Sequence, residues 1–161
     1  MLAVVLWIAG AIAALITLYI LYMVIRTIYT HATGVAPRGV WVAISAPATA
    51  RVREVFSIVV TVTDTSGADR VISSIDFDAG YLKHIAIESI DPAPREKPSN
   101  APTLGVHVHS FDLKVPANAS TSVTFRCHPM QPGDAAGDIT VYVDKVSFRY
   151  ISKPARTIVS V

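Results

Sequence analysis

The amino-acid sequence predicts an all-β protein, an antiparallel β-sandwich that follows one N-terminal transmembrane α-helix. Two observations carry this prediction. Residues 1–25 contain no Asp, Glu, Lys, Arg or His, and from residue 39 onward apolar and polar residues alternate along short runs separated by turn residues. We therefore expect a transmembrane helix at residues 1–26, a tether at residues 27–38 and one sandwich domain at residues 39–161.

The composition narrows the class of protein further. The chain has 161 residues, of which 52% are hydrophobic and 16% charged, and this excludes a disordered or coiled-coil protein. The formal net charge is +2, without a run of Lys or Arg. Such a weak charge provides no electrostatic surface for nucleic acid, so we expect no nucleic-acid partner.

The apolar run at residues 1–25 is long enough to cross a bilayer. As a helix it would extend about 37 Å at roughly 1.5 Å per residue, against a hydrocarbon core of about 30 Å. A secretory signal peptide is the alternative, but its apolar region is shorter, about 7 to 15 residues, and follows a basic stretch. No basic residue precedes this run. We expect a retained anchor rather than a cleaved leader.

Aromatic and small residues in this segment suggest its surroundings. Rings near the two ends of the run suit the bilayer interfaces, although they also simply fill lipid-facing volume. These aromatic residues are Trp7, Tyr19, Tyr22 and Tyr29. Small side chains that would let a second helix approach closely are Ala9, Gly10, Ala13, Ala14 and Thr17. No His lies within the run, so we expect no haem or chlorophyll ligand and no bound cofactor.

The orientation of the predicted anchor is not settled by charge alone. Arg26 and Arg38 follow the run, and the positive-inside rule therefore favours a cytoplasmic sandwich. The type of domain argued below favours the outside of the cell. We expect a single-pass protein of a bacterial inner membrane with an extracytoplasmic, periplasmic domain.

The strands of the sandwich are predicted from period-two runs rich in β-branched and aromatic residues. These runs lie at residues 39–45, 55–65, 71–78, 84–90, 104–115, 121–127, 138–144 and 146–152. Turn residues separate them at 66–67, 78–80, 116–118 and 131–133, and we expect no second helix. Inward positions are Phe56, Ile58, Val60, Val62, Val123, Phe125, Cys127, Ile139, Val141 and Val143. The single cysteine, Cys127, is predicted to be a small buried hydrophobic residue.

Two stretches resemble bacterial immunoglobulin-like modules of the CARDB type. GVWVAISAPATARVREVFSIVVTVTDTSG is similar to their opening strands, and LKVPANASTSVTFRCHPMQPGDAAGDITVYVD to their closing hairpin. The resemblance covers roughly residues 39–160 and implies an immunoglobulin-like β-sandwich used for adhesion, ligand presentation or protein docking outside cells. It supplies no catalytic motif. The insertion at 91–103 and the extra run at 146–152 depart from a minimal module.

Metal sites have weak candidates in the sequence. Soft ligands for copper or zinc are His107, His109, Cys127, His128 and Met130. Strand phase separates them, because Cys127 points inward and His128 outward, and a solvated or hydrogen-bonded surface pair is the simpler interpretation of His107 and His109. Asp76 and Asp78 share a strand face and are candidate calcium ligands, but an exposed strand end that runs into a turn is the simpler interpretation. We expect no metal.

Other features point to binding rather than catalysis. No GxSxG, HExxH, P-loop, GxGxxG or CxxC motif is present, so we expect no enzyme. A proline-rich loop is a candidate semi-rigid partner contact, or only a connection between strands, and its central residues are Pro94, Arg95, Glu96, Lys97 and Pro98. Asn118, Ala119 and Ser120 form a glycosylation sequon that we interpret as turn chemistry.

Three functions remain open at this point. The first is a non-catalytic accessory subunit of a respiratory, photosynthetic or transport complex, with integral membrane subunits and the lipid bilayer as partners. The second is an anchored binding or adhesion module, which requires an exposed aromatic platform, for which the candidates are Tyr81, Tyr142 and Tyr150. The third is a copper- or zinc-handling accessory protein.

Overall fold

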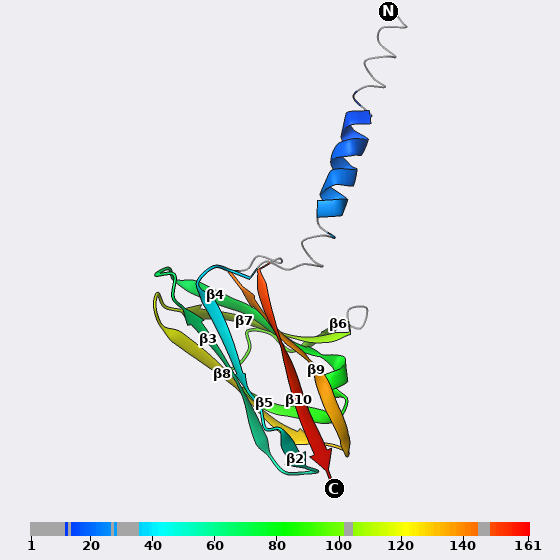
Figure 1. Ribbon diagram of the computed structural model, residues 1–161, viewed down its shortest axis with the longest axis vertical. Helices are drawn as coiled ribbons and strands as arrows, with labels where there is room; N and C mark the ends of the chain where they lie inside the picture. Colours follow the sequence, from blue (N-terminus) through cyan, green and yellow to red (C-terminus); the bar gives the residue numbers. More distant parts are fainter. Residues whose placement is uncertain (1–11, 13, 27, 29–35, 102–104, 145–148) are drawn as a thin grey trace, which may run out of the picture. The chain divides into compact units, whose positions relative to one another are not determined.

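The computed structural model describes residues 12, 14–26, 28, 36–101, 105–144 and 149–161 (Figure 1). The chain divides into two compact units, Met1–Gly34 and Val35–Val161. In the first unit residues 14–26 are helical, and Ala14, Thr17, Tyr19 and Tyr22 are exposed. Within the described residues, no helix meets the length and apolarity needed to span a membrane. Trp7, Ala9, Gly10, Ala13 and Tyr29 lie outside the described residues.

The second unit is a sandwich of two β-sheets. Its strands are β1 (Val40–Ser45), β2 (Thr49–Arg51), β3 (Phe56–Asp64), β4 (Arg70–Asp78), β5 (Ile85–Asp91), β6 (Ser99–Ala101), β7 (Val106–Val115), β8 (Ser120–Pro129), β9 (Gly133–Val143) and β10 (Tyr150–Ser160). One sheet has the order β1-β3-β8-β5 and the other β2-β10-β9-β4-β7-β6. All pairs are antiparallel except the parallel pair of β10 and β2. The predicted all-β sandwich is therefore confirmed.

Strand alternation builds the core between the sheets, as the sequence predicts. Along β3 and β8, Ile58 pairs with Phe125 and Val60 with Val123, and all four side chains are completely buried. Cys127 is also buried, in agreement with its predicted inward phase. Stacked sheets require such inward apolar rows, because each sheet buries one face against the other.

Two bulges change the alternation. The pairing of β4 shifts between Ile72 and Ser74, and the pairing of β5 shifts between Ile87 and Ser89. An extra residue at a bulge restores the inward phase of the residues that follow it. Ile90 therefore pairs opposite the inward Phe125, although simple alternation from Ile87 would place it on the outer face.

Several elements differ from the expectation drawn from sequence. A short helix, α2 (Ala79–Leu82), stands where only a turn was expected, because the Asp78 carboxylate accepts the Gly80 N–H at 2.6 Å and caps it. The short strands β2 and β6 were not predicted. β9 begins at Gly133 rather than residue 138, and β10 continues to Ser160 rather than ending at residue 152.

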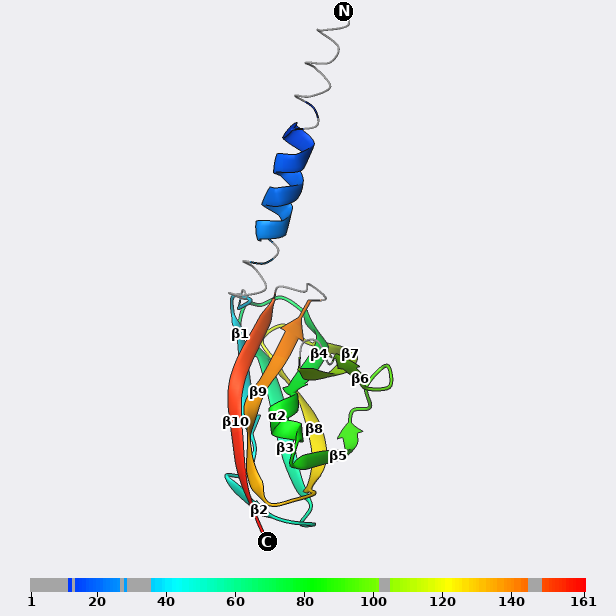
Figure 2. The same ribbon diagram turned by 90° about the vertical axis from the view of Figure 1, so that its right-hand side faces the viewer.

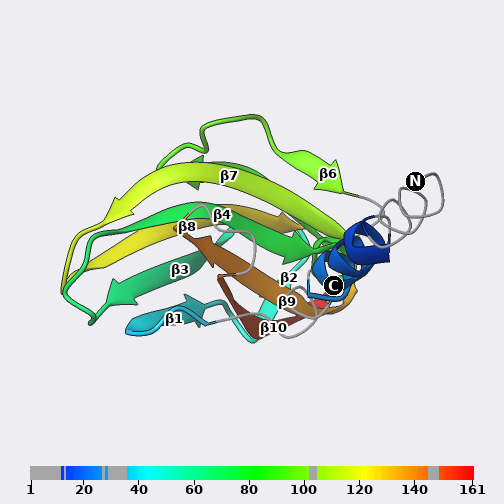
Figure 3. The same ribbon diagram turned by 90° about the horizontal axis from the view of Figure 1, so that it is seen from above.

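The connection from β5 to β6 crosses the side of the sandwich. β5 is the last strand of its sheet, and β6 is a three-residue strand at the margin of the other, beside β7. Figure 2 shows β5, this connection and β6 on the same side of the domain, and Figure 3 shows β6 at the margin of the molecule. The two sheets are thus bridged here by residues 92–98 instead of by a paired strand.

Candidate functional site

A cleft of about 420 Å³ lies between β5 and β7 under the β5–β6 connection. Its walls are mainly apolar and come from both sheets, from the end of α2 and from two prolines of the connection. The lining residues are Leu82, Ile85, Ala86, Ile87, Glu88, Ser89, Ile90, Pro94, Pro98, His107 and His109. This volume lies within the range of about 300–1,000 Å³ that small-molecule sites in proteins occupy.

His109 projects inward from β7 rather than outward to solvent. It pairs across the sheet with Ile75, and its ring packs against Phe77 and Phe125 with centroid distances of 5.8 and 5.5 Å. The exposed fraction of His109 is 3%. The expectation of a solvated or hydrogen-bonded surface pair is therefore wrong for His109, because its strand phase points the ring into the sandwich, whereas His107 is half-buried in the wall of the cleft.

The His109 imidazole lacks a hydrogen-bond partner among the described residues at both ring nitrogens. Burial, followed by the charge of His107, lowers its pKa from 6.5 to about 4, so the ring is neutral near pH 7. A neutral imidazole has one N–H donor and one acceptor nitrogen. Leaving such a group unpaired in the interior costs about 1–3 kcal/mol.

The rim of the cleft is polar and is held in place from both sides. Glu88 of the β5 bulge lies 3.3 Å from Arg126 Nε and 3.0 Å from His128 Nδ1. On the other side, the Arg95 backbone N–H donates to the Ser110 carbonyl at 2.8 Å. The predicted contact loop therefore separates into two parts: Pro94 and Pro98 line the cleft, while Arg95, Glu96 and Lys97 are exposed.

The candidate soft metal ligands do not come together. Cys127 is in the core, His128 lies on the outer face beside Glu88, and Met130 is 51% exposed. Among the residues that the structure describes, no group of three or more His, Cys, Asp or Glu is arranged to hold a metal ion. The copper or zinc hypothesis gains no support from this part of the chain.

Asp76 and Asp78, the candidate calcium ligands, have different surroundings in the structure. Asp78 caps α2, whereas Asp76 is 8% exposed and one of its carboxylate oxygens has no partner among the described residues. Burial raises the pKa of Asp76 to about 6, and a hydrogen bond from the Ser74 side chain opposes this shift. The prediction of an exposed strand end is wrong for Asp76, because it lies inside β4 and pairs with Val108 of β7 on one side and Thr140 of β9 on the other.

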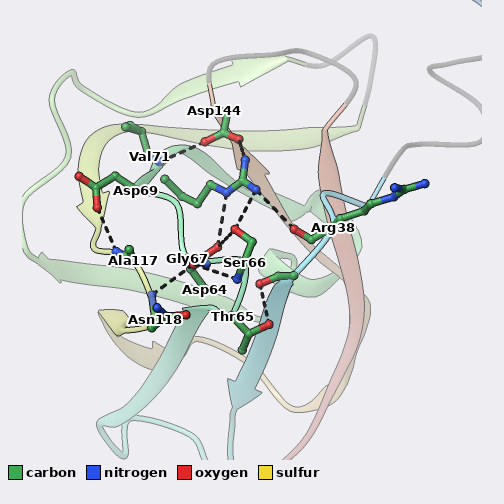
Figure 4. Close-up of polar contacts among 12 residues, drawn as sticks. Arg38, Asp64, Thr65, Ser66, Gly67, Asp69, Val71, Ala117, Asn118 and Asp144 are labelled. Atoms are coloured by element: carbon green, nitrogen blue, oxygen red, sulfur yellow. Dashed lines mark hydrogen bonds and ion pairs between the residues drawn. The ribbon is translucent and has the colours of Figure 1, made fainter.

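A polar network joins the start of the domain to three turns (Figure 4). Asp64, which is 1% exposed, accepts hydrogen bonds from Ser66, Gly67, Arg70 and Asn118. These bonds, the Ser66 hydroxyl first, lower the pKa of Asp64 to about 2. Asn118 of the sequon has a positive φ of 55°, as turn chemistry predicts.

Arg70 extends the network to the residue that follows β9 and to the segment that precedes β1. Its guanidinium lies 2.7 Å from Asp144 and donates to the Arg38 carbonyl at 3.4 Å. Gly39 follows with a φ of +69°, and a Cβ there would lie 2.7 Å from Ser66 Cβ. Every partner in this network is used for folding, so we regard it as structural.

A second depression lies where the chain enters the sandwich. It has a volume of about 510 Å³ and is lined by residues 36–42, Thr65, Ile151 and Lys153. Trp41, on the edge strand β1, is 69% exposed beside Arg38. We refer to residues 36–42, Thr65, Ile151 and Lys153 as the entry groove.

The candidate aromatic platform is only partly assembled. Tyr81 is completely buried, and its hydroxyl lies 2.9 Å from Thr157 Oγ1, so it cannot serve as a platform. Tyr142 and Tyr150 pair across β9 and β10 with ring centroids 5.4 Å apart, and both are half-buried.

Comparisons with known proteins do not identify a family for this chain. No protein-family profile and no curated protein sequence matches the chain. Similar solved structures include AvmM, which catalyses macrocyclization in alchivemycin A biosynthesis, with TM-score 0.49 and 11% identity over 77% of this chain and 90% of that chain. The cupredoxin domain of amoB from Nitrosocaldus yellowstonii has TM-score 0.48 and 9% identity, with coverages of 77% and 88%.

A CARDB domain from Pyrococcus furiosus is also similar, with TM-score 0.43 and 15% identity over 74% of this chain and 94% of that domain. All three TM-scores are below 0.5, so these similarities identify neither a family nor a function for this chain. The function must be argued from the chain's own residues.

Proposed function

We propose that this chain is a non-catalytic accessory subunit of a larger membrane protein complex. In this role the apolar segment at residues 1–25 anchors it, and the sandwich docks on the extramembrane surface of the partner subunits. The observation that carries the proposal is Trp41, a large aromatic residue left 69% exposed in the entry groove. Tryptophan is enriched among residues that dominate protein–protein interfaces.

The neighbours of Trp41 also suit a docking role. Arg38 and Lys153 line the same groove and provide two cations around the exposed ring. The Gly39 carbonyl accepts the Thr65 backbone N–H at 2.6 Å and Val40 pairs with Asp64, so the groove is built on rigid backbone. A preorganised surface loses less entropy when a partner binds.

Three of the buried titratable groups, Asp64, Asp76 and Cys127, lie apart from one another and outside the cleft that His109 lines. Asp64 belongs to a saturated hydrogen-bond network, Asp76 lies on β4, and Cys127 lies in the core. Acid–base or nucleophilic catalysis needs such groups within hydrogen-bond reach of one another in a cleft.

Extraction of native membranes tests the proposal. A tag at Val161, which is 96% exposed, allows recovery of the full chain in mild detergent, followed by native gel and mass spectrometry. We expect a defined set of membrane proteins in stoichiometric amount, and loss of that set in Trp41→Ala. Ile158→Ala, a matched exposed apolar residue at 48%, should keep it. A chain that migrates alone in several detergents would overturn the proposal.

The proposed location is a bacterial inner membrane with the sandwich on the extracytoplasmic side. Cys127 is the one cysteine of the chain and is buried, and burial raises the pKa of its thiol to about 12. It therefore contributes little background to thiol labelling. Val161→Cys should react with an impermeant maleimide in intact spheroplasts, and protection until lysis would place the domain in the cytoplasm.

A membrane-anchored binding or adhesion module is the second candidate, because β9 and β10 bring Tyr142 and Tyr150 together. A surface polymer would bind on this pair. Under this alternative, Tyr142→Ala abolishes binding to isolated cell-wall material, while Trp41→Ala leaves it unchanged.

A further inference from the structure

The cleft between β5 and β7 contains imidazoles where a sandwich places apolar side chains. Strand alternation puts His107, His109 and Phe111 of β7 on its inward face. Phe111 is 3% exposed and belongs to the core, as this position requires. His109 is equally buried but faces the cleft.

Two aromatic rings hold the His109 ring in position, yet its two nitrogens make no hydrogen bond to the described residues. Phe77 and Phe125 meet it in edge-on contacts with interplanar angles of 86° and 70°. Both nitrogens remain without a partner among the described residues. Because buried polar groups in proteins are nearly always hydrogen-bonded, this arrangement indicates that a partner comes from outside the described residues.

The remaining walls define the chemistry of that partner. Leu82, Ile85, Ile87 and Ile90 provide an apolar wall, and Pro94 and Pro98 close it from the connection. Glu88 is the only Asp, Glu, Lys or Arg residue among the described residues that line the cleft. It is paired with Arg126 at the rim, so the cleft offers no counter-charge for a buried ion.

We propose that the cleft binds one small, uncharged, mostly apolar molecule, and that the His109 imidazole forms a hydrogen bond with a hydroxyl or carbonyl group of that molecule. The apolar walls hold its body, and His109 selects for the polar group. Such a site discriminates strongly against an analogue that lacks the polar group, since the imidazole then stays unpaired. The cleft shares no lining residue with the entry groove, so this inference is independent of the docking role.

Three related probes test the proposal on the full chain in lipid nanodiscs. Equilibrium dialysis at neutral pH measures uptake of 2-naphthol, naphthalene and 2-naphthoate beyond the uptake by empty discs. We expect about one 2-naphthol per chain, bound at least about tenfold more tightly than either of the other two probes. His109→Phe should weaken 2-naphthol binding by a similar factor and leave naphthalene binding unchanged. The control Ile158→Ala, at an exposed position of β10 that does not line the cleft, should retain the affinity of the wild type.

A measurement on the wild type keeps the test independent of the variant's folding. In the full chain labelled with ¹⁵N-histidine, 2-naphthol should shift the ring nitrogen signals of His109, and naphthalene should not produce the same hydrogen-bond shift. The proposal is overturned if 2-naphthol uptake does not exceed that of empty discs, or if naphthalene binds as tightly. Equal 2-naphthol affinity in the wild type and His109→Phe, or unchanged His109 signals, would overturn it as well.

Discussion

Asp64 is a carboxylate that the fold surrounds with hydrogen-bond donors at the junction of three turns. Two backbone N–H groups of its own turn and one from Asn118 point at it, together with the Ser66 hydroxyl at 2.6 Å. Charge-assisted bonds of this kind are stronger than neutral ones. A single side chain therefore ties the β3–β4 turn to the β7–β8 turn.

Replacement of Asp64 by Asn is expected to lower the melting temperature by roughly 5 °C or more. The amide presents an NH₂ group to backbone donors, so at least one of them loses its acceptor. Asp69→Asn, an exposed aspartate that accepts one bond from Ala117, is the matched control and should change the melting temperature much less. Circular dichroism of both variants measures the difference, and equal melting temperatures would contradict the assigned role of Asp64.

The lowered pKa of Asp64 also has a pH signature. Its folded value of about 2 lies below the ordinary 3.8, so the ionised form is favoured by folding. The stability that it contributes is present above pH 3.8 and is lost as the pH falls toward 2. Asp64→Asn should therefore flatten the stability curve in this acid range.

At the scale of elements, α2 is attached to the sandwich through one buried hydrogen-bond chain. The Tyr81 hydroxyl lies 2.9 Å from Thr157 Oγ1 of β10. The Thr157 hydroxyl in turn donates to the Pro47 carbonyl at 2.8 Å. The chain therefore links α2, β10 and the segment between β1 and β2. A short helix depends on such tertiary contacts, because one turn is not stable by itself.

Tyr81→Phe is expected to lower the free energy of unfolding by about 1 kcal/mol, since it removes one neutral hydrogen bond and keeps the ring. Thr157→Val should cost more, because it also leaves the Pro47 carbonyl unpaired. Urea denaturation of both variants and of the double variant forms a thermodynamic cycle, and we expect a coupling energy of at least about 0.5 kcal/mol. Additive effects would show that the two hydroxyls do not interact.

β10 shows why strand ends were the least accurate part of the sequence prediction. In the sequence, Lys153 and Pro154 indicate the end of a strand. In the structure β10 continues past them, and the side chains of Ala155, Thr157 and Val159 are buried on its inward face. β2 pairs only with Ile158, Val159 and Ser160, so β10 is an edge strand at Pro154. Proline is tolerated at an edge because the missing N–H interrupts no ladder there.

At the scale of the whole molecule, two buried titratable groups, His109 and Asp76, have opposite effects on how stability depends on pH. Burial and the charge of His107 lower the pKa of His109 to about 4, so the unfolded chain binds this proton more tightly and stability falls as the pH drops from 6.5 to 4. Burial raises the pKa of Asp76 to about 6, above its ordinary 3.8, so the folded chain binds that proton first. Stability from Asp76 therefore rises as the pH drops through the same window.

Each effect amounts to about 3 kcal/mol over this window, with opposite sign. As the pH drops from 6.5 to 4, we expect the free energy of unfolding of His109→Phe to rise relative to that of the wild type. We expect that of Asp76→Asn to fall relative to the wild type. Urea denaturation at several pH values measures both differences. Parallel curves for the wild type and both variants would show that neither group titrates as its surroundings indicate.

The sequence alone determined the all-β class, the inward rows of β3 and β8 and the burial of Cys127, because period-two alternation within one strand sets which side chains face the core. The apolar segment at residues 1–25 is equally visible in the sequence, and its role as an anchor stays a prediction. Short elements such as α2, β2 and β6 escaped detection, because a few residues carry no periodicity and are stabilised by partners far along the chain.

Only the tertiary structure decided what the histidines do. The sequence showed that His107 and His109 share a face of one strand, and it predicted an exposed pair. Which face of β7 meets the core depends on its pairing with β4, and the cleft depends on the bulge in β5 and the path of residues 92–98. These contacts join residues that are distant in sequence, so no local pattern encodes them, and they turn two apparent surface imidazoles into the polar wall of an apolar cleft.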